Sequence, residues 1–342
     1  MMAPRAEKGE LLIVGPSWLG DAVMMGALVR RLKAERPARR ITVLTPAHLE
    51  DLAARLPGVD ATLVNPFGHG ALRLAERLRF GRSLGGRFDA AIVLPHSWKS
   101  ALIPLFAGAP RRTGFVGEAR WGVLNDARRL DAAALPRMVD RFCLLAEPRG
   151  AVRPAETPRP RLAADPAAIA ATLARLGLAS DPSAVALCVG AEYGPAKRWP
   201  AAHFAALARA LRAVGRDVWL IGGPGDAAIG AEVAALAPGV ADLTGRTTLA
   251  EAIELVAAAG AVVTNDSGLM HVAAALDRPI VALYGSSSPA FTPPLSERAA
   301  ILSQGLDCSP CFERICPLGH FKCLNELTPE RVLGATLERL AA

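Results

Sequence analysis

Two basic residues in the middle of the chain have the placement of a phosphate-binding site. Lys197 and Arg198 lie in 190-GAEYGPAKRWP-200, between an apolar run and Pro200, a residue type favoured where a helix begins. A cation beside the free N–H groups of a helix start attracts anions, most naturally phosphate. The alternative is a solvated Lys-Arg pair. We favour phosphate binding by Lys197.

The stretch 264-TNDSGLMHVAAALDRP-279 is a second candidate anion site. Asp266 and Ser267 can cap a helix, and Gly268 permits close approach of the backbone to a ligand. His271 lies four residues after Ser267, so both side chains share one helix face. An ordinary capped helix with a core histidine would show the same residues. The N–H groups exposed at such a start favour a binding site.

A carboxylate near the N-terminus has the placement of a general base. In 15-GPSWLGDAVM-24, Asp21 falls at an expected helix start, after Gly15 and Gly20, which allow tight backbone turns. The helix dipole keeps such a carboxylate ionised, as a general base requires. An Asp that only stabilises the helix is the alternative, but it leaves the glycine pair and an expected exposed Trp18 unexplained.

Two further loops are placed to surround a nucleoside. In 222-GGPGDA-227, Asp226 either caps the next helix or accepts hydrogen bonds from ribose hydroxyls. In 243-LTGRTTLAE-251, Thr247 or Thr248 is suited to cap a helix with Glu251 as capping-box partner. We favour the cap there, although the loop could still flank a base.

Together these loops predict transfer from a nucleotide-activated donor. The chain has neither the G-x-G-x-x-G dinucleotide fingerprint nor a P-loop. No D-x-D-like metal-binding pair lies near the loops. We therefore expect lysine, helix dipole and His271 to replace a metal in neutralising the leaving diphosphate.

Alternating apolar runs and amphipathic stretches predict repeated βαβ units with parallel sheets covered by helices on both faces. We expect strands at residues 11–15, 41–45, 59–65, 88–95, 111–115, 184–190, 217–223, 261–265 and 279–285. We expect helices at residues 20–36, 47–56, 70–84, 98–107, 136–147, 200–214, 226–236, 248–259, 268–276 and 328–341. Such sheets bind ligands beyond the carboxyl ends of their strands, where all the candidate loops lie.

The length of 342 residues predicts two α/β domains. Residues 148–166 contain five prolines and no apolar period, which indicates a linker. We expect domains at 1–160 and 161–327, with ligand bound in the cleft between them. The final helix, within 328–342, is expected to pack back on the first domain.

Composition and charge restrict the class of protein and the kinds of binding partner that we expect. The chain is 51% hydrophobic and 21% charged, without a long apolar span or a signal-peptide core, so we expect a globular cytoplasmic protein. The net charge is +7, but the arginines are scattered and aromatics make up 5%, which argues against nucleic acid. An anionic small substrate, an anionic lipid face or merely a solvated basic surface agrees with this charge.

The motifs GPSWLGDAVM, GAEYGPAKRWP and VTNDSGLMHVAAALDRPIVALYGSSSPAFTPPL resemble the lipopolysaccharide heptosyltransferases of glycosyltransferase family 9, most of all their type II subgroup. The resemblance runs from about residue 10 to 340. It implies a GT-B fold, in which two Rossmann-like domains face each other across a cleft. It also implies inverting transfer of L-glycero-D-manno-heptose from ADP-heptose to the first heptose of the inner core, carried on Kdo-lipid A.

The resemblance also implies roles for the candidate residues. Asp21 matches the general base and Lys197 the diphosphate-binding residue. The donor-binding loop is matched by Asp266, Ser267, Gly268 and His271. Asp226 and Thr247 align more loosely near ribose and adenine. No catalytic cofactor is implied, and the acceptor suggests peripheral contact with the anionic cytoplasmic face of the inner membrane.

Three other functions remain open. A related transferase, of heptosyltransferase type I or III, would use a different acceptor. A sugar-nucleotide epimerase of the same fold would need no acceptor. A nucleotide-sugar binding module would bind the donor without turnover.

Four of the six cysteines crowd into 308-CSPCFERICPLGHFKC-323, where the sequence departs from the best-known family members. Cys308, Cys311, Cys316 and Cys323 could hold a structural zinc ion or an iron–sulfur cluster, with His320 as a spare ligand. Redox-sensitive disulfides and free thiols are the alternatives, and none of the three places these cysteines in the reaction. The other two cysteines, Cys143 and Cys188, lie in apolar runs and are expected in the core.

Overall fold

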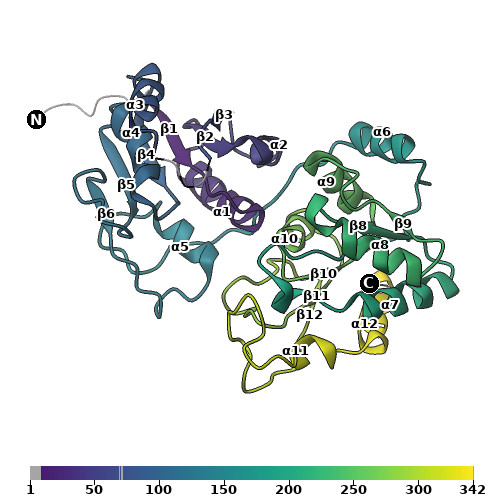
Figure 1. Cartoon of the computed structure of the whole chain (residues 1–342). Coiled ribbons are helices and arrows are strands. Elements are labelled where there is room, and N and C mark those ends of the chain that lie inside the picture. Colours follow the sequence, from purple (N-terminus) through teal and green to yellow (C-terminus); the bar gives the residue numbers. More distant parts are fainter. Residues whose placement is uncertain (1–8, 69, 71, 342) are drawn as a thin grey trace, which may run out of the picture. The chain divides into compact units, whose positions relative to one another are not determined.

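The computed structural model describes residues 9–68, 70 and 72–341. They form two compact units, which divide between Pro160 and Arg161 and are each built on one sheet (Figure 1). Within the described residues, no helix is long and apolar enough to cross a membrane.

The first unit is a six-stranded parallel sheet in the order β3-β2-β1-β4-β5-β6. Its strands are β1 (Glu10–Val14), β2 (Arg40–Pro46), β3 (Ala61–Asn65), β4 (Phe88–Val93), β5 (Arg111–Phe115) and β6 (Asp126–Arg128). Its helices are α1 (Leu19–Glu35), α2 (Glu50–Ala54), α3 (Leu74–Ser83), α4 (Leu102–Phe106) and α5 (Met138–Leu144), with 3-10 turns η1 (Ala47–Leu49) and η2 (Trp98–Ala101). Helix α1 packs against α2 and α5, whereas α3 packs against α4.

The second unit repeats this plan in the order β12-β11-β10-β7-β8-β9. Its strands are β7 (Val185–Cys188), β8 (Val218–Ile221), β9 (Ala241–Asp242), β10 (Ala261–Asn265), β11 (Ile280–Leu283) and β12 (Ala299–Leu302). Its helices are α6 (Pro166–Leu176), α7 (Ala201–Ala213), α8 (Ala227–Leu236), α9 (Leu249–Ala258), α10 (Gly268–Ala275), α11 (Lys322–Asn325) and α12 (Pro329–Ala341), with 3-10 turns η3 (Pro195–Lys197) and η4 (Pro224–Asp226). Helix α9 packs against α6 and α10, whereas α7 packs against α8 and α12.

The strand order, in which each unit's first strand is central, is that of doubly wound nucleotide-binding domains. The central strands are buried apolar runs, as parallel strands covered on both faces should be. The expected fold class, α/β with two Rossmann-like parallel sheets, is confirmed. Cys143 and Cys188 are buried in these cores, as expected.

Several elements differ from the sequence expectation. Helix α6 begins in the stretch taken as linker, where Asp165 accepts a hydrogen bond from the Ala167 N–H at 2.9 Å and Gly177 ends the helix in the left-handed region. Strands β6, β9 and β12 and helix α11 are short and were not predicted. Helix α12 packs within the second unit, on α7, β10, β11 and β12. Its expected packing on the first domain stays a prediction.

Candidate functional site

The candidate site of the second unit lies where its strand order reverses. Strands β7 and β10 are parallel neighbours at the centre of the sheet, and the chain continues outward from them on opposite sides. The carboxyl ends of such a strand pair form the usual ligand crevice of a doubly wound sheet. The loop after β7 carries Lys197, and β10 leads directly into Asp266 and helix α10.

Lys197 and Asp266, predicted separately from two motifs, meet at this point. The Lys197 ammonium donates to Asp266 Oδ2 at 2.6 Å, and the Asp266 side chain is only 4% exposed. The same ammonium lies 5.1 Å from the centre of the Tyr193 ring, within the range of a cation–π contact. A buried carboxylate requires its cation, so the pair fixes Lys197 beside the start of α10.

Asn265, which we did not single out from the sequence, ties the loops of the site together. Its Oδ1 accepts the Trp199 N–H at 3.0 Å, and its Nδ2 donates to the carbonyls of Val189 and Gly190, each at 3.1 Å. Asn265 is fully buried, so these bonds are made away from water. The only sequence signal was its place between a buried strand and the Asp-Ser-Gly motif.

The start of helix α10 has the position expected of a cap but not the capping bond. Ser267 is the N-cap residue and Gly268 begins the helix. Among the described residues, the Ser267 hydroxyl caps no N–H of the first turn; it lies 3.3 Å from Thr264 Oγ1. The first-turn N–H groups therefore lack a side-chain cap and suit an anionic ligand.

His271 lies on α10 and is 5% exposed. The pKa of its imidazole is lowered to about 4, chiefly by burial; Asp266 opposes the shift and Lys197 adds to it. The side chain is therefore neutral near pH 7. It can donate or accept a hydrogen bond, but the charge we expected it to contribute to a leaving diphosphate is absent.

Asp226 approaches the same loop from the end of β8. Its Oδ2 accepts the Gly223 N–H at 3.0 Å, and its Oδ1 lies 3.9 Å from the Arg198 guanidinium. A Cβ at Gly190 would lie 2.1 Å from the Asp226 carboxylate, so only glycine permits this approach.

The predicted capping box of the next loop is formed by Thr248. Thr248 Oγ1 accepts the Glu251 N–H at 3.2 Å, and Glu251 accepts the Thr248 N–H at 2.8 Å. Thr247, the other candidate, is half-buried just before this cap. This local interpretation of the loop is confirmed.

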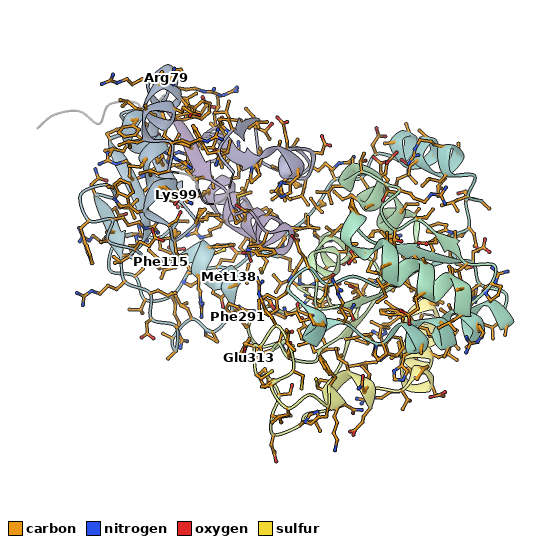
Figure 2. All side chains as sticks on the ribbon, viewed as in Figure 1. Arg79, Lys99, Phe115, Met138, Phe291 and Glu313 are labelled. Carbon is orange, nitrogen blue, oxygen red and sulfur yellow. The ribbon has the colours of Figure 1, made fainter. Side chains whose placement is uncertain are left out.

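In the first unit, Asp21 lies in the first turn of α1, directly after the central strand β1. It is half-buried, and Trp18 before it is 46% exposed. The neighbouring central strand β4 leads to Lys99, labelled in Figure 2, whose ammonium donates to the Gly70 carbonyl at 3.3 Å. Asp21 and Lys99 thus follow the two strands at which this sheet reverses its order.

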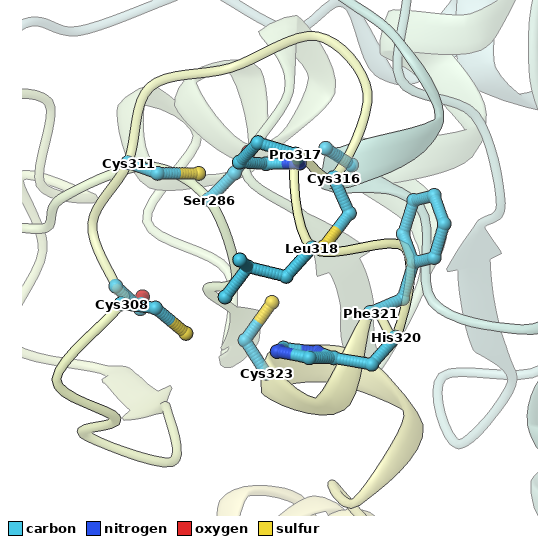
Figure 3. Close-up of a pocket in the computed structure, with 11 residues that line it drawn as sticks. Ser286, Cys308, Cys311, Cys316, Pro317, Leu318, His320, Phe321 and Cys323 are labelled. Atoms are coloured by element: carbon cyan, nitrogen blue, oxygen red, sulfur yellow. The ribbon is translucent and has the colours of Figure 1, made fainter.

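The four clustered cysteines line one small pocket together with His320 (Figure 3). Its volume of about 20 Å³ has room for about one water molecule, so the pocket is too small for a substrate. All four cysteines are free thiols. In the described part of the chain, however, no three His, Cys, Asp or Glu side chains are grouped so that they could hold a metal ion.

The chain has two doubly wound units, and in the second a lysine and an uncapped helix start lie at the switch point, where the strand order reverses. These features are typical of proteins that bind a nucleotide or another phosphorylated ligand at such a point. The family model of glycosyltransferase family 9 (heptosyltransferase) matches residues 77–322. The chain belongs to this family and is a glycosyltransferase.

Several known proteins are similar in sequence to this chain over nearly its whole length. Lipopolysaccharide heptosyltransferase 2 of Salmonella typhimurium is 45% identical, over 95% of this chain and 96% of that protein. Lipooligosaccharide heptosyltransferase 2 of Haemophilus influenzae is 41% identical, over 97% and 99%. The solved structure of E. coli ADP-heptose lps heptosyltransferase II is 42% identical, covers 97% of this chain and 98% of its own, and has a TM-score of 0.88.

Proposed function

We propose that this enzyme transfers L-glycero-D-manno-heptose, with inversion, from ADP-heptose to the first heptose of the lipopolysaccharide inner core. The observation that carries the proposal is the Lys197–Asp266 contact beside the uncapped start of α10. Lysine and helix N–H groups suit the diphosphate of a nucleotide sugar. The identity to heptosyltransferase 2 of Salmonella typhimurium supports the choice of donor and acceptor.

In this proposal Asp21 is the general base. Its carboxylate takes the proton of the acceptor hydroxyl as that oxygen attacks the anomeric carbon, opposite the departing ADP. Lys197, Ser267, Gly268 and the neutral His271 bind the donor by charge and hydrogen bonds. The developing charge on ADP is stabilised by the lysine and the helix start.

Two further residues are proposed to lie near the ribose and the adenine of the donor. Asp226 follows strand β8, with its carboxylate 3.9 Å from the Arg198 guanidinium of the Lys197 loop, and is proposed to accept hydrogen bonds from the ribose hydroxyls. Thr247, before the cap of α9, is proposed to lie near adenine.

The decisive experiment is incubation with ADP-heptose and defined truncated acceptors, with products identified by mass. Asp21→Asn should keep ADP affinity and lose turnover by a factor of about 100 or more. Asp51→Asn, an exposed acid on α2, is the matched control. Unchanged turnover in Asp21→Asn would remove the base assignment, and transfer only to an acceptor without heptose would favour a type I enzyme.

We further propose that the enzyme acts in the cytoplasm, at the inner face of the inner membrane. An anionic lipid-linked acceptor is a fitting partner for a chain of net charge +7. Binding to vesicles with and without anionic lipid tests this contact, which should weaken as salt rises.

A structural metal at the cysteine pocket has less support. The four thiols face one pocket, but the described side chains are not grouped as a coordination shell. Metal analysis of protein purified without added zinc decides between a metal site and free thiols.

A further inference from the structure

The charged side chains at and next to the proposed diphosphate site do not balance the charge of the ligand. Lys197 is paired with Asp266, and Arg198 lies nearest to Asp226. His271 is buried and neutral. The net charge of these five side chains is therefore zero, although the ligand proposed for them is a dianion whose charge grows as the sugar leaves. A further cation would reduce this deficit.

Arg314 supplies a positive charge at the same aromatic ring that Lys197 contacts. Its guanidinium lies 5.2 Å from the centre of the Tyr193 ring, the same ring that the Lys197 ammonium contacts at 5.1 Å. The two positive charges are thus no more than about 10 Å apart, which is about one Debye length at 0.1 M salt. Within the residues that the structure describes, Arg314 is exposed and has no ion-pair partner.

The backbone around Arg314 is anchored to the phosphate loop. The Ala196 N–H donates to the Arg314 carbonyl at 3.0 Å. The Tyr193 hydroxyl donates to the Phe312 carbonyl at 2.6 Å, and the Phe312 N–H donates to the Ser286 carbonyl at 2.7 Å. These bonds join three loops of the second unit, so the backbone at Arg314 has a defined position beside the loop that carries Lys197.

Two carboxylates belong to the same loops. Glu192 precedes Tyr193, and Glu313, labelled in Figure 2, precedes Arg314; both are exposed. Neither forms an ion pair with Arg314 among the described residues. Exposed charges are screened by water and ions, so these carboxylates reduce the attraction of Arg314 for an anion without cancelling it.

We propose that Arg314 is a second phosphate-binding residue, which holds the donor's diphosphate together with Lys197, and that Tyr193 positions both cations. This rests on the proposed function, because it assigns the same donor site. A planar guanidinium can bind two phosphate oxygens at once, which an ammonium cannot.

Binding of ADP and of adenosine, measured by calorimetry on the full-length chain, tests the proposal. Arg314→Ala should weaken ADP binding about 10- to 100-fold, the range for a hydrogen bond to a charged group, and leave adenosine binding unchanged. Arg331→Ala, an exposed arginine on α12, makes the same change of net charge and should leave both affinities unchanged. Unaltered ADP affinity in Arg314→Ala would overturn the proposal, as would an equal loss for ADP and adenosine.

A conservative variant separates charge from loop packing. Arg314→Lys should recover part of the ADP affinity, whereas a loss as large as in Arg314→Ala would contradict a charge-based role. Tyr193→Leu should weaken ADP binding through both cations, and unchanged ADP affinity would remove Tyr193 as their positioning residue. Protein that binds ADP through Arg314 but transfers no heptose would contradict the proposed function alone.

Discussion

Replacing Asn265 with alanine should destabilise the second unit by about 3–5 kcal/mol. The side chain forms hydrogen bonds with three buried backbone groups, the Trp199 N–H and the carbonyls of Val189 and Gly190. Each hydrogen bond contributes about 1 kcal/mol net, and a buried group left unpaired costs about 1–3 kcal/mol. A water molecule entering the space would reduce the cost, which sets the lower end of the range.

The assay is scanning calorimetry of the full chain. For a unit of this size, each kcal/mol shifts the midpoint by about 2–4 °C, so Asn265→Ala should lower the transition of the second unit by about 6–20 °C. Asn325→Ala is the matched control, because Asn325 is exposed and its side chain donates one hydrogen bond, to the His320 carbonyl at 3.0 Å. The control should stay within about 2 °C of wild type.

A shift below about 2 °C in Asn265→Ala would refute this reasoning. It would mean that the three backbone groups find other partners, and that the loops do not depend on Asn265 for their positions. A large shift in both variants would instead indicate a general sensitivity of the unit to loss of asparagine.

Three further predictions concern the same site. In the unfolded chain His271 binds a proton below about pH 6.5, whereas in the folded protein it does so only below about pH 4. The free energy of unfolding should therefore fall by up to about 3 kcal/mol as the pH drops from 6.5 to 4. His271→Gln should reduce this loss, as measured by denaturant titrations at several pH values. Lys197→Ala should lose both ADP affinity and stability, and adding Asp266→Asn should restore part of the stability but not the affinity; recovery of ADP binding in the double variant would contradict the pairing. Gly194→Ala should weaken ADP binding several-fold in a titration, because the new Cβ would lie 2.6 Å from a neighbouring carbonyl at a φ of +154°, whereas Gly225→Ala, with open space, should match wild type.

The parts of the fold that depend on short-range patterns could be predicted from the sequence. The Thr248–Glu251 capping box needs residues only three apart, and the core strands are continuous apolar runs. Strands such as β9, with two residues, are too short to show alternation. Helix α6 carried Asp165, Pro166 and Gly177 as start and stop signals, but the prolines before it favoured a linker.

The candidate site shows where sequence patterns stop being informative. Lys197 and Asp266 could each be named from a motif, but their contact requires β7 and β10 to be neighbours. His271 could be placed on a helix face, whereas its neutrality follows from burial that the whole unit creates. Arg314 was missed because it lies in the cysteine-rich segment, far along the chain from the loop that it joins.

The central position of β7 has a consequence for synthesis of the chain. Val185 pairs with Ala261, so one edge of this strand stays open until β10 has been made. At 5–20 residues per second, that interval lasts roughly 4–15 s. During it, the nascent second unit exposes an apolar strand edge to other chains in the cell. A chaperone that delays association until Ala261 has emerged should therefore raise the yield of folded protein.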